Sequence, residues 1–540
     1  TNDAPLVSVE AGDADSDTLT ETNTTLTATD TLTTTDLDLT DTVSVAVSSV
    51  AESGDTSGIA NGTLLAMMSV TSGNFIDNTE TQDQFTWSFN SGAEAFDYLA
   101  VGETLTLTYT LTVTDSQGAT DTHDVTININ GSNDAPVVSV EAGDSDSDTL
   151  TETDSGLSTS DTLTTTDLDV TDTVSVAVSS VAESGDTSGI ANGTLLAMMS
   201  VTSGNFIDAT ETQDQFTWTF NSGAEAFDYL AVGETLTLTY TLTVTDSQGA
   251  TDTHDVTINI NGSNDAPVVS VEAGDADSDT LTETNTTLTA TDTLTTTDID
   301  TTDTVSVAVS SVAESGDTSG IANGTLLGMM SVTSGNFIDN TETQDQFTWS
   351  FNSGAEAFNY LAVGETLTLT YTLTVTDSQG ATDTHDVTIN INGANDAPIV
   401  SVEAGDADSD TLTETNTTLT ATDTLTTTDL DLTDTVSVAV SSVAESGDTS
   451  GITNGTLLAM MSVTSGNFID ATETQDQFTW SFNSGAEDFD YLAVGETLTL
   501  TYTLTVTDSQ GATDTHDVTI NINGSNDAPL VSVEAGDSDS

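Results

Sequence analysis

The chain of 540 residues contains 89 aspartate and glutamate residues and no lysine or arginine, which gives a formal net charge of −89. This composition excludes salt bridges to lysine or arginine within the chain, and it excludes the basic patches that bind nucleic acids and anionic membranes. Cysteine is absent, so disulfides and thiolate metal sites are excluded as well. Because so large a charge opposes the compact state by self-repulsion, a folded form requires cations from solution.

A long sequence period organises the chain. Near-copies of ININGSNDAP recur, and Pro5, Pro136, Pro267, Pro398 and Pro529 lie 131 residues apart. A fixed period of this kind indicates a tandem array of structural units. The expected domains are residues 1–131, 132–262, 263–393 and 394–524, and 525–540 begins a further repeat.

Apolar residues alternate with polar ones in several segments of the first repeat, at 42–50, 85–89, 104–114 and 124–129 in chain order. In the third of these, TLTLTYTLTVT, every second residue is apolar, which places all the apolar side chains on one face of a strand. The period of two argues against the disordered chain that high charge and abundant polar residues would otherwise indicate. Each repeat therefore contains several half-buried strands.

Turn-forming residues separate these strands, in ESGDTSG, SGN, NSGAE, VGE and DSQGAT. Gly, Asn, Asp and Ser supply the positive φ angles and local hydrogen bonds of turns. The segment GTLLAMMSV at 62–70 is ambiguous, and we predict a strand because so short an apolar run fits a buried strand. About seven to nine short strands per repeat, with regular turn signals, predict an all-β fold built from β-sandwich domains.

Aromatic residues gather in the middle of each repeat. In the first repeat they are Phe75, Phe85, Trp87, Phe89, Phe96 and Tyr98. Exposed aromatics with polar neighbours would suit a glycan-binding platform. These are the bulkiest apolar groups of a threonine-rich unit, however, and we expect them to form its core.

The acidic residues form four clusters in each repeat. GDADSDTLTE opens like an EF-hand loop, but Thr18 and Thr24 stand where that loop requires glycine and glutamate, so the motif is absent. TDLDLTD places Asp36 and Asp38 on one side of an extended segment, with Asp41 after them. TDSQGATDTHD surrounds a turn, and SNDAP supplies an asparagine and an aspartate at the repeat boundary.

Carboxylates and a side-chain amide that lie close together, with no basic partner in the chain, suit a hard cation. Ca²⁺ takes about six to eight oxygen ligands in a flexible geometry, whereas Mg²⁺ requires a stricter octahedron and keeps its waters. We therefore predict calcium as the cofactor. The alternative interpretation is that the clusters are solvated acidic loops.

The last third of the first repeat reads YLAVGETLTLTYTLTVTDSQGATDTHDVTININGSNDAP. It resembles the VCBS repeat of bacterial surface proteins in its LAxGETL stretch, its long threonine-rich strand, its VTD and glycine turn, its final VTI strand and its closing NDAP. The wider unit resembles the cadherin-like and bacterial Ig-like extender domains of giant adhesins exported by type I secretion. The resemblance implies a tandem array of Ig-like or cadherin-like β-sandwich domains joined end to end by short linkers.

The resemblance also implies a calcium site at each junction between domains. In cadherin-like arrays, such a site uses an acidic residue of an early loop, a D-x-D pair, an aspartate in a turn before the last strand and an Asn-Asp linker. The matching positions are Glu21, Asp36, Asp38, Asp115, Asn133, Asp134, Glu152, Asp167, Asp169, Asp246, Asn264, Asp265, Glu283, Asp298, Asp300, Asp377, Asn395, Asp396, Glu414, Asp429, Asp431, Asp508, Asn526 and Asp527.

The linker motif NGSNDAP has a physical reason to recur. Proline fixes its own φ near about −65° and restricts the residue before it to extended geometry, so the link is short and stiff. Asn and Asp contribute oxygen atoms at the same place. A metal that bridged two domains there would stop the junction from bending.

Catalysis is the contrasting class of function. Each repeat has one histidine within DTHDVT, at His123, His254, His385 and His516. A histidine beside an aspartate can act as a base or a metal ligand. The chain has no G-x-S-x-G or H-E-x-x-H motif and no lysine or arginine to hold an oxyanion. We expect a structural histidine at a strand end and no enzymatic activity.

The sequence thus predicts a calcium-stiffened stalk of a secreted adhesin on a bacterial cell surface, with calcium ions and neighbouring repeats as its partners. No apolar run approaches the roughly 20 residues of a transmembrane helix, and no basic-then-apolar signal opens the chain. The alternative is a subunit of an extracellular fibre or surface layer, which needs an edge strand or apolar patch that pairs with other copies. Glycan binding by each repeat ranks last.

Overall fold

The computed structural model describes residues 1–529, so the part of the expected further repeat at 530–540 lies outside the described residues. Two compact units are distinguished, Thr1–Asn264 with the first two repeats and a second unit that begins at Asp265 and contains the third and fourth repeats. Within both units, each repeat folds as the same two-sheet β-sandwich. The predicted all-β fold class is confirmed.

Each repeat has nine strands and one short helix within the described residues. The first repeat contains β1 (Leu6–Ser8), β2 (Ser16–Thr20), β3 (Thr27–Thr35), β4 (Val43–Ser53), α1 (Asn61–Ala66), β5 (Met68–Val70), β6 (Asn74–Ile76), β7 (Gln82–Asn90), β8 (Thr104–Asp115) and β9 (Thr120–Asn130). The second contains β10 (Val137–Ser139), β11 (Ser147–Thr151), β12 (Ser158–Thr166), β13 (Val174–Ser184), α2 (Asn192–Ala197), β14 (Met199–Val201), β15 (Asn205–Ile207), β16 (Gln213–Asn221), β17 (Thr235–Thr245) and β18 (Thr251–Asn261). The third contains β19 (Val268–Ser270), β20 (Ser278–Thr282), β21 (Thr289–Thr297), β22 (Val305–Ser315), α3 (Asn323–Leu327), β23 (Met330–Val332), β24 (Asn336–Ile338), β25 (Gln344–Asn352), β26 (Thr366–Thr376) and β27 (Thr382–Asn392). The fourth contains β28 (Ile399–Ser401), β29 (Ser409–Thr413), β30 (Thr420–Thr428), β31 (Val436–Ser446), α4 (Asn454–Leu458), β32 (Met461–Val463), β33 (Asn467–Ile469), β34 (Gln475–Asn483), β35 (Thr497–Thr507) and β36 (Thr513–Asn523).

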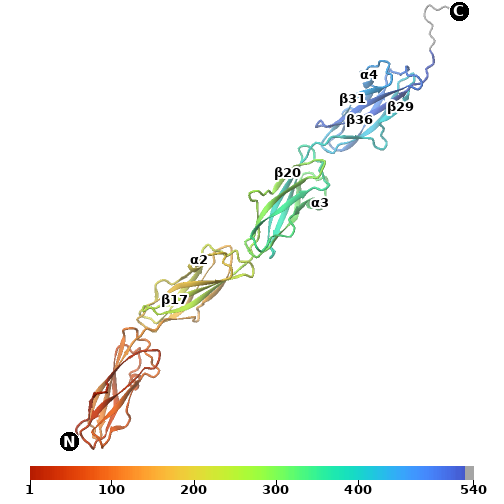
Figure 1. Ribbon diagram of the computed structural model, residues 1–540. Helices are drawn as coiled ribbons and strands as arrows, with labels where there is room; N and C mark the ends of the chain where they lie inside the picture. The colour runs from red at the N-terminus through yellow and green to blue at the C-terminus, as the bar shows by residue number, and fades with distance from the viewer. Residues whose placement is uncertain (530–540) are drawn as a thin grey trace, which may run out of the picture. The chain divides into compact units, whose positions relative to one another are not determined.

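The two sheets of the first repeat have the strand orders β1-β3-β7-β5 and β2-β9-β8-β4-β6. Strand β2 pairs in parallel with β9, from Ser16 opposite Thr126 to Thr20 opposite Asn130. The other neighbouring strands are antiparallel. The same topology recurs in the fourth repeat, where Figure 1 labels β29, β31 and β36 of the five-stranded sheet.

The core of the first repeat forms where the two sheets face each other. The five apolar residues of β8, from Leu105 to Val113, have no exposed surface, because alternation puts all of them on the inner face. The aromatic residues expected in the core are buried, apart from the half-buried Tyr98. The indole N–H of Trp87 donates to the carbonyl of Ala14 at 2.8 Å, so this large side chain is buried without an unsatisfied polar group.

The strand predicted at 62–70 is wrong over most of its length. Residues Asn61–Ala66 form α1, and only Met68–Val70 form a strand, β5. The segment contains Leu and Ala, which favour helix, and Leu64 on one face of the turn is buried. The hydroxyl of Tyr109 donates to the carbonyl of Leu64 at 2.8 Å, which satisfies an acceptor near the end of the helix.

Candidate metal centre

The D-x-D pair of the second repeat lies in the loop between β12 and β13. The backbone N–H of Asp169 donates to Asp167 Oδ1 at 3.1 Å, and that of Asp172 donates to the carbonyl of Asp169 at 2.9 Å. The loop therefore curls around its own carboxylates, and all three side chains are buried. Burying three acidic side chains in one loop is unfavourable unless their charge is compensated.

A fourth carboxylate reaches this loop from the turn after β17. Asp246 Oδ1 accepts hydrogen bonds from the backbone N–H groups of Gln248 and Ala250, at 2.8 and 2.9 Å. One oxygen from each of Asp167, Asp172 and Asp246 lies within 4.8 Å of the others, an arrangement that can hold a metal ion. The same group recurs as Asp36, Asp41 and Asp115, as Asp298, Asp303 and Asp377, and as Asp429, Asp434 and Asp508.

The Asn-Asp linker is hydrogen-bonded to these carboxylates. The side-chain amide of Asn133 donates to Asp246 Oδ2 at 2.8 Å, and the backbone N–H of Asp134 donates to Asp169 Oδ2 at 2.8 Å. The equivalent pairs are Asn2 with Asp115 at 2.8 Å, Asp3 with Asp38 at 2.7 Å, Asp265 with Asp300 at 2.9 Å, Asn395 with Asp508 at 2.9 Å, and Asp396 with Asp431 at 2.8 Å. The linker thus belongs structurally to the aspartates of the repeat that follows it.

Glu21 reaches the same linker from the preceding repeat. It directly follows β2, and its side chain is 1 % exposed. Its Oε1 accepts hydrogen bonds from the backbone N–H of Ser132, at 2.8 Å, and from the Ser132 hydroxyl. The amide of Asn23 donates to Asp134 Oδ1 at 2.9 Å. The early-loop residues of one repeat therefore hold the start of the next.

The metal ligands that the sequence predicts for one repeat therefore lie at its two opposite ends. Asp115 and Asp38 lie beside the linker that precedes the first repeat, because they accept hydrogen bonds from Asn2 and Asp3. Asp36 lies at the same end, because it clusters with Asp115. Glu21 lies beside the linker that follows the first repeat. In the first unit the junction combines Glu21, Asn133 and Asp134 with Asp167, Asp169 and Asp246 of the second repeat. In the second unit it combines Glu283, Asn395 and Asp396 with Asp429, Asp431 and Asp508.

A further carboxylate, which the sequence reasoning missed, joins Glu21. Burial, followed by the negative charges of Asp134 and Asp97, raises the pKa of Glu21. In the fourth repeat the equivalents Glu414, Asp490 and Asp527 place one oxygen each within 4.8 Å of one another. We call Glu21, Asp97 and Asp134, with their equivalents in the third and fourth repeats and with Glu152 and Asp228 of the second, the end cluster.

The ionised form of the aspartates in the D-x-D loop is disfavoured when no cation is bound. Burial raises the pKa of Asp167 to about 6 and that of Asp169 to about 7, and the negative charges of Asp134 and Asp172 act in the same direction. The same shifts recur for Asp298 and Asp300, to about 6 and about 7, and for Asp429 and Asp431, to about 6 and about 7. A bound cation would remove this penalty.

Asp115 differs, because its turn supplies hydrogen bonds. Burial favours its neutral form, but hydrogen bonds from Asn2 and from the backbone N–H groups of the turn outweigh burial and hold its pKa below the usual value. The turn aspartate of the first repeat is thus a carboxylate fixed in the ionised state. It is suited to coordinate a cation without a cost for losing a proton.

Buried oxygen atoms remain available at the first junction. Seven side chains each have one buried oxygen with no hydrogen-bond partner among residues 1–529, and they are Glu21, Asp97, Asn133, Asp134, Asp167, Asp169 and Asp172. The junction of the second unit has the same set, which is Glu283, Asn359, Asn395, Asp396, Asp429, Asp431 and Asp434. Carboxylate and amide oxygens are the ligands that Ca²⁺ prefers, and it takes about six to eight of them.

The sequence signals for the missed residues differ in strength. Asp41 and its equivalents Asp172, Asp303 and Asp434 stand three positions after the second aspartate of the D-x-D pair, in TDLDLTD, so the cluster itself was visible. Asp97 stands alone in AFDYL, between aromatic residues that pack in the core. Only the fold brings it to Glu21, and no local pattern indicates that.

The other acidic clusters have structural partners. Asp13 accepts hydrogen bonds from the hydroxyls of Thr31 and Thr33, at 2.9 and 2.7 Å. Asp121 Oδ2 accepts the backbone N–H of Val7 at 2.9 Å, which ties β1 to β9. His123 Nε2 lies 3.1 Å from Asp15 Oδ2, and the pair recurs in the other repeats at 3.2 to 3.3 Å. These contacts connect the GDADSD loop to the sandwich.

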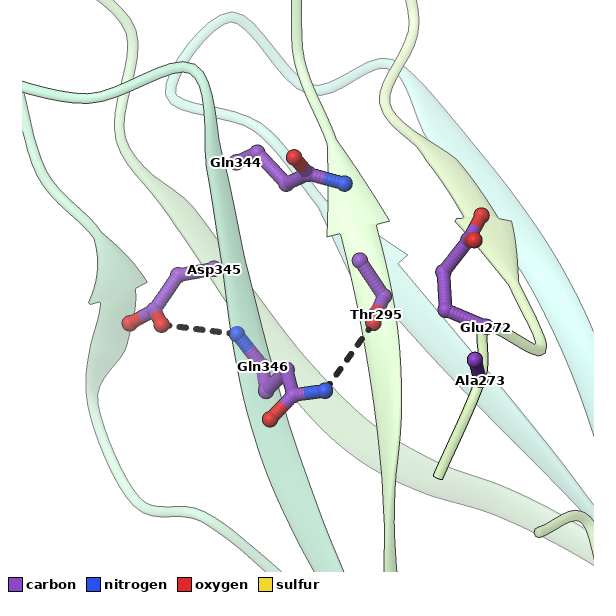
Figure 2. Close-up of a pocket in the computed structure, with 6 residues that line it drawn as sticks. All are labelled: Glu272, Ala273, Thr295, Gln344, Asp345 and Gln346. Carbon is purple, nitrogen blue, oxygen red and sulfur yellow. Dashed lines mark hydrogen bonds between the residues drawn. The ribbon is translucent and has the colours of Figure 1, made fainter. Parts of the chain in front are cut away.

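Each of the last three repeats also has an open polar hollow beside its four-stranded sheet. In the third repeat Gln346 donates to Thr295 Oγ1 at 3.3 Å, and Gln344 and Glu272 lie on either side of Thr295 (Figure 2). The six residues that line this hollow are Glu272, Ala273, Thr295, Gln344, Asp345 and Gln346. None of them is aromatic, so the hollow lacks the stacking surface on which the glycan-binding alternative depended.

Comparison with known proteins gives matches of fold only. No protein-family model matches the sequence, and no curated protein matches it. Among solved structures, extracellular cadherin domains 1–5 of protocadherin gamma B2 match with 14 % identity and a TM-score of 0.38, over 98 % of this chain and 82 % of that one. Domains EC1–4 of Drosophila N-cadherin match with 12 % identity and a TM-score of 0.24, over 90 % and 92 %. At these values the matches carry nothing about ligands or partners, and the VCBS resemblance stays a hypothesis. Within residues 1–529, no helix has the length and apolar character needed to span a membrane.

Proposed function

We propose that the chain is a structural extender of a secreted bacterial surface adhesin, and that calcium bound at the junctions between its repeats stiffens it. One observation carries the calcium part of this proposal. Buried carboxylate oxygens from two successive repeats converge on the Asn133-Asp134 linker of the first unit and on the Asn395-Asp396 linker of the second, in a chain that has no lysine or arginine to neutralise them. The adhesin part rests on the VCBS-like motifs and on the repetition itself.

The linker residues would transmit the effect of the ion. The side chain of Asp134 accepts a hydrogen bond from Asn23 of the first repeat, and its backbone N–H donates one to Asp169 of the second. An ion held by oxygens of Glu21 and Asp134 on one side, and of Asp167 and Asp169 on the other, would neutralise charges that otherwise repel each other across the linker. Bending the junction would then require those oxygens to leave the ion.

The test uses the whole chain in small-angle X-ray scattering, with millimolar calcium and with excess chelator. We expect a calcium-dependent increase in maximum dimension that does not change with protein concentration. The double variant Asp134→Ala and Asp396→Ala should lose most of that increase, whereas the exposed pair Asp83→Ala and Asp345→Ala should retain it. An unchanged profile on chelation would contradict the proposal, and particles that grow with concentration would favour the fibre alternative.

A further inference from the structure

The four repeats differ in charge at three positions only. Asp154 stands where the other repeats have asparagine, Asp488 stands where they have alanine, and Asn359 stands where they have aspartate. Every other acidic position of the repeat is acidic in all four copies. Charge is therefore constant over the repeat except at these three places.

All three positions lie at the end cluster. Burial and the charges of Glu152 and Asp154 raise the pKa of Asp228, which is the second repeat's equivalent of Asp97. Partial desolvation and the neighbouring charges, that of Asp488 first among them, raise the pKa of Asp490 in the fourth repeat. Asn359 occupies the same position in the third repeat. The fold thus gathers the variable charges around one group of oxygens.

The end cluster of the third repeat retains the oxygens of the first but has fewer charges. Glu283 is 2 % exposed, and its Oε2 has no hydrogen-bond partner in the described part of the chain. Asn359 Oδ1 and Asp396 Oδ2 are buried and equally without partners there. Two carboxylates and one amide therefore stand where the first repeat has three carboxylates, Glu21, Asp97 and Asp134.

The glutamate of the end cluster also accepts fewer hydrogen bonds from the linker in the third repeat than in the first. Glu21 Oε1 accepts both the backbone N–H and the hydroxyl of Ser132. Ala394 replaces that serine, so Glu283 Oε1 accepts the backbone N–H of Ala394 at 3.0 Å and has no serine hydroxyl to accept from at this position. The carboxylate that would anchor a cation is held by one hydrogen bond from this residue instead of two.

We propose that the junctions are graded in cation affinity, and that the junction between the third and fourth repeats binds calcium more weakly than the junction between the first and second. This inference rests on the proposed function. Calcium affinity depends on the number of charged ligands and on the rigidity of the site, and Asn359 and Ala394 reduce both. The third-to-fourth junction is then the joint that loosens first as calcium falls, with a difference in affinity on the order of tenfold.

The test measures both junctions in the full chain. Because the chain has no cysteine, spin labels can be placed at equivalent exposed sites with Asn78→Cys and Ala209→Cys across the first junction, and with Asn340→Cys and Ala471→Cys across the third. Pulsed dipolar spectroscopy then gives the width of each distance distribution as a function of free calcium. We expect the 340/471 distribution to narrow at about tenfold higher calcium than the 78/209 distribution.

Two reciprocal variants test the cause. Asn359→Asp should move the midpoint of the third junction toward that of the first, and Asp97→Asn should raise the midpoint of the first. Gln344→Glu and Asp83→Asn make the same charge changes at exposed sites and should move neither midpoint. Equal midpoints that neither reciprocal variant shifts would overturn this inference alone. If neither distribution narrows with calcium, the proposed function itself is wrong.

Discussion

The side-chain amide of Asn133 donates a hydrogen bond of 2.8 Å to Asp246 Oδ2. This bond holds the linker against the turn that follows β17 and leaves Asn133 Oδ1 buried, with no hydrogen-bond partner within residues 1–529. The amide is thus a neutral donor placed among carboxylates. A negatively charged residue at the same position would reverse the interaction.

Replacement of this amide should make the junction more dependent on calcium. In Asn133→Asp, a carboxylate faces Asp246 at hydrogen-bond distance, so we expect the free energy of unfolding in chelator to fall by about 1–3 kcal/mol. Saturating calcium should recover most of this loss, because the added charge is a calcium ligand. Differential scanning calorimetry of the whole chain with and without calcium measures both effects. Asn78→Asp, in an exposed loop, is the matched control.

Neutralising a buried aspartate should raise the free energy of unfolding in chelator, whereas the added charge in Asn133→Asp should lower it. Asp169 is 1 % exposed and surrounded by like charges. Asp169→Asn therefore should stabilise the chain in chelator by about 1–2 kcal/mol while weakening calcium binding at that junction. Calorimetric unfolding and isothermal titration with calcium give the two quantities. A variant that is less stable than the parent in chelator would show that repulsion within the loop is not significant.

The raised pKa values predict how stability changes with pH. Burial raises the pKa of Asp167 to about 6 and that of Asp169 to about 7, above the ordinary pKa of an aspartate, so the folded state binds more protons than the unfolded state between the ordinary and the raised values. The metal-free chain should therefore lose stability as pH rises from about 4 to 7. Thermal unfolding in chelator across this range measures the trend, and Asp169→Asn should show a smaller slope than the parent.

Calcium binding should follow the reverse trend over the same range. Protons compete with the ion for these carboxylates, so the affinity should weaken as pH falls below about 7, and binding should release protons. Titration calorimetry in buffers of different ionisation enthalpy measures the protons released. Release that is unchanged in Asp169→Asn would contradict the assignment of this residue.

The glycine before the linker should not tolerate a side chain. A Cβ atom at Gly131 would lie 2.1 Å from the carbonyl oxygen of Leu99 and 2.2 Å from that of Ala100. Gly131→Ala must shift the backbone that leads to Ser132, and we expect a loss of about 3 kcal/mol in stability together with weaker calcium binding at this junction. Gly62→Ala, where a Cβ meets nothing within 4 Å, is the control. Unfolding and calcium titrations of both variants check the prediction.

Local patterns in the sequence were sufficient to predict the sandwich. The unbroken alternation around Tyr109 can satisfy both an apolar interior and a polar exterior only as a strand, so its face was determined by the residues themselves. The segment with Leu64 was not determined in this way, because a short run of leucine, alanine and methionine fits a helix and a buried strand equally well. The hydroxyl of Tyr109 and the core around Leu64 favour the helix, and these are contacts between distant residues.

In the candidate site, too, some features follow from local sequence patterns and others depend on contacts between distant residues. Asp167, Asp169 and Asp172 share one loop, and their association was visible from their spacing. The proximity of Asp97 to Glu21 depends on how β2 and the segment after β7 meet at one end of the sandwich. Spacing also did not indicate that Glu21 and Asp36 serve opposite ends of one repeat, because fourteen residues of strand and turn lie between them. Pairing between strands, which the sequence leaves open, decides both points.

The parallel pairing of β2 with β9 determines how a repeat responds to tension. The chain enters the sandwich through the three-residue strand β1, which pairs with β3, continues into β2, and leaves the sandwich directly after β9. Once the three pairs of β1 have opened, a pull on the two ends drives β2 and β9 in opposite directions along their length. The paired residues from Ser16–Thr126 to Thr20–Asn130 are then loaded together, in shear. Antiparallel strands joined by a hairpin would instead open one hydrogen bond at a time. Each repeat is therefore built to resist traction along the chain, with its mechanical clamp beside the linker that transmits the force.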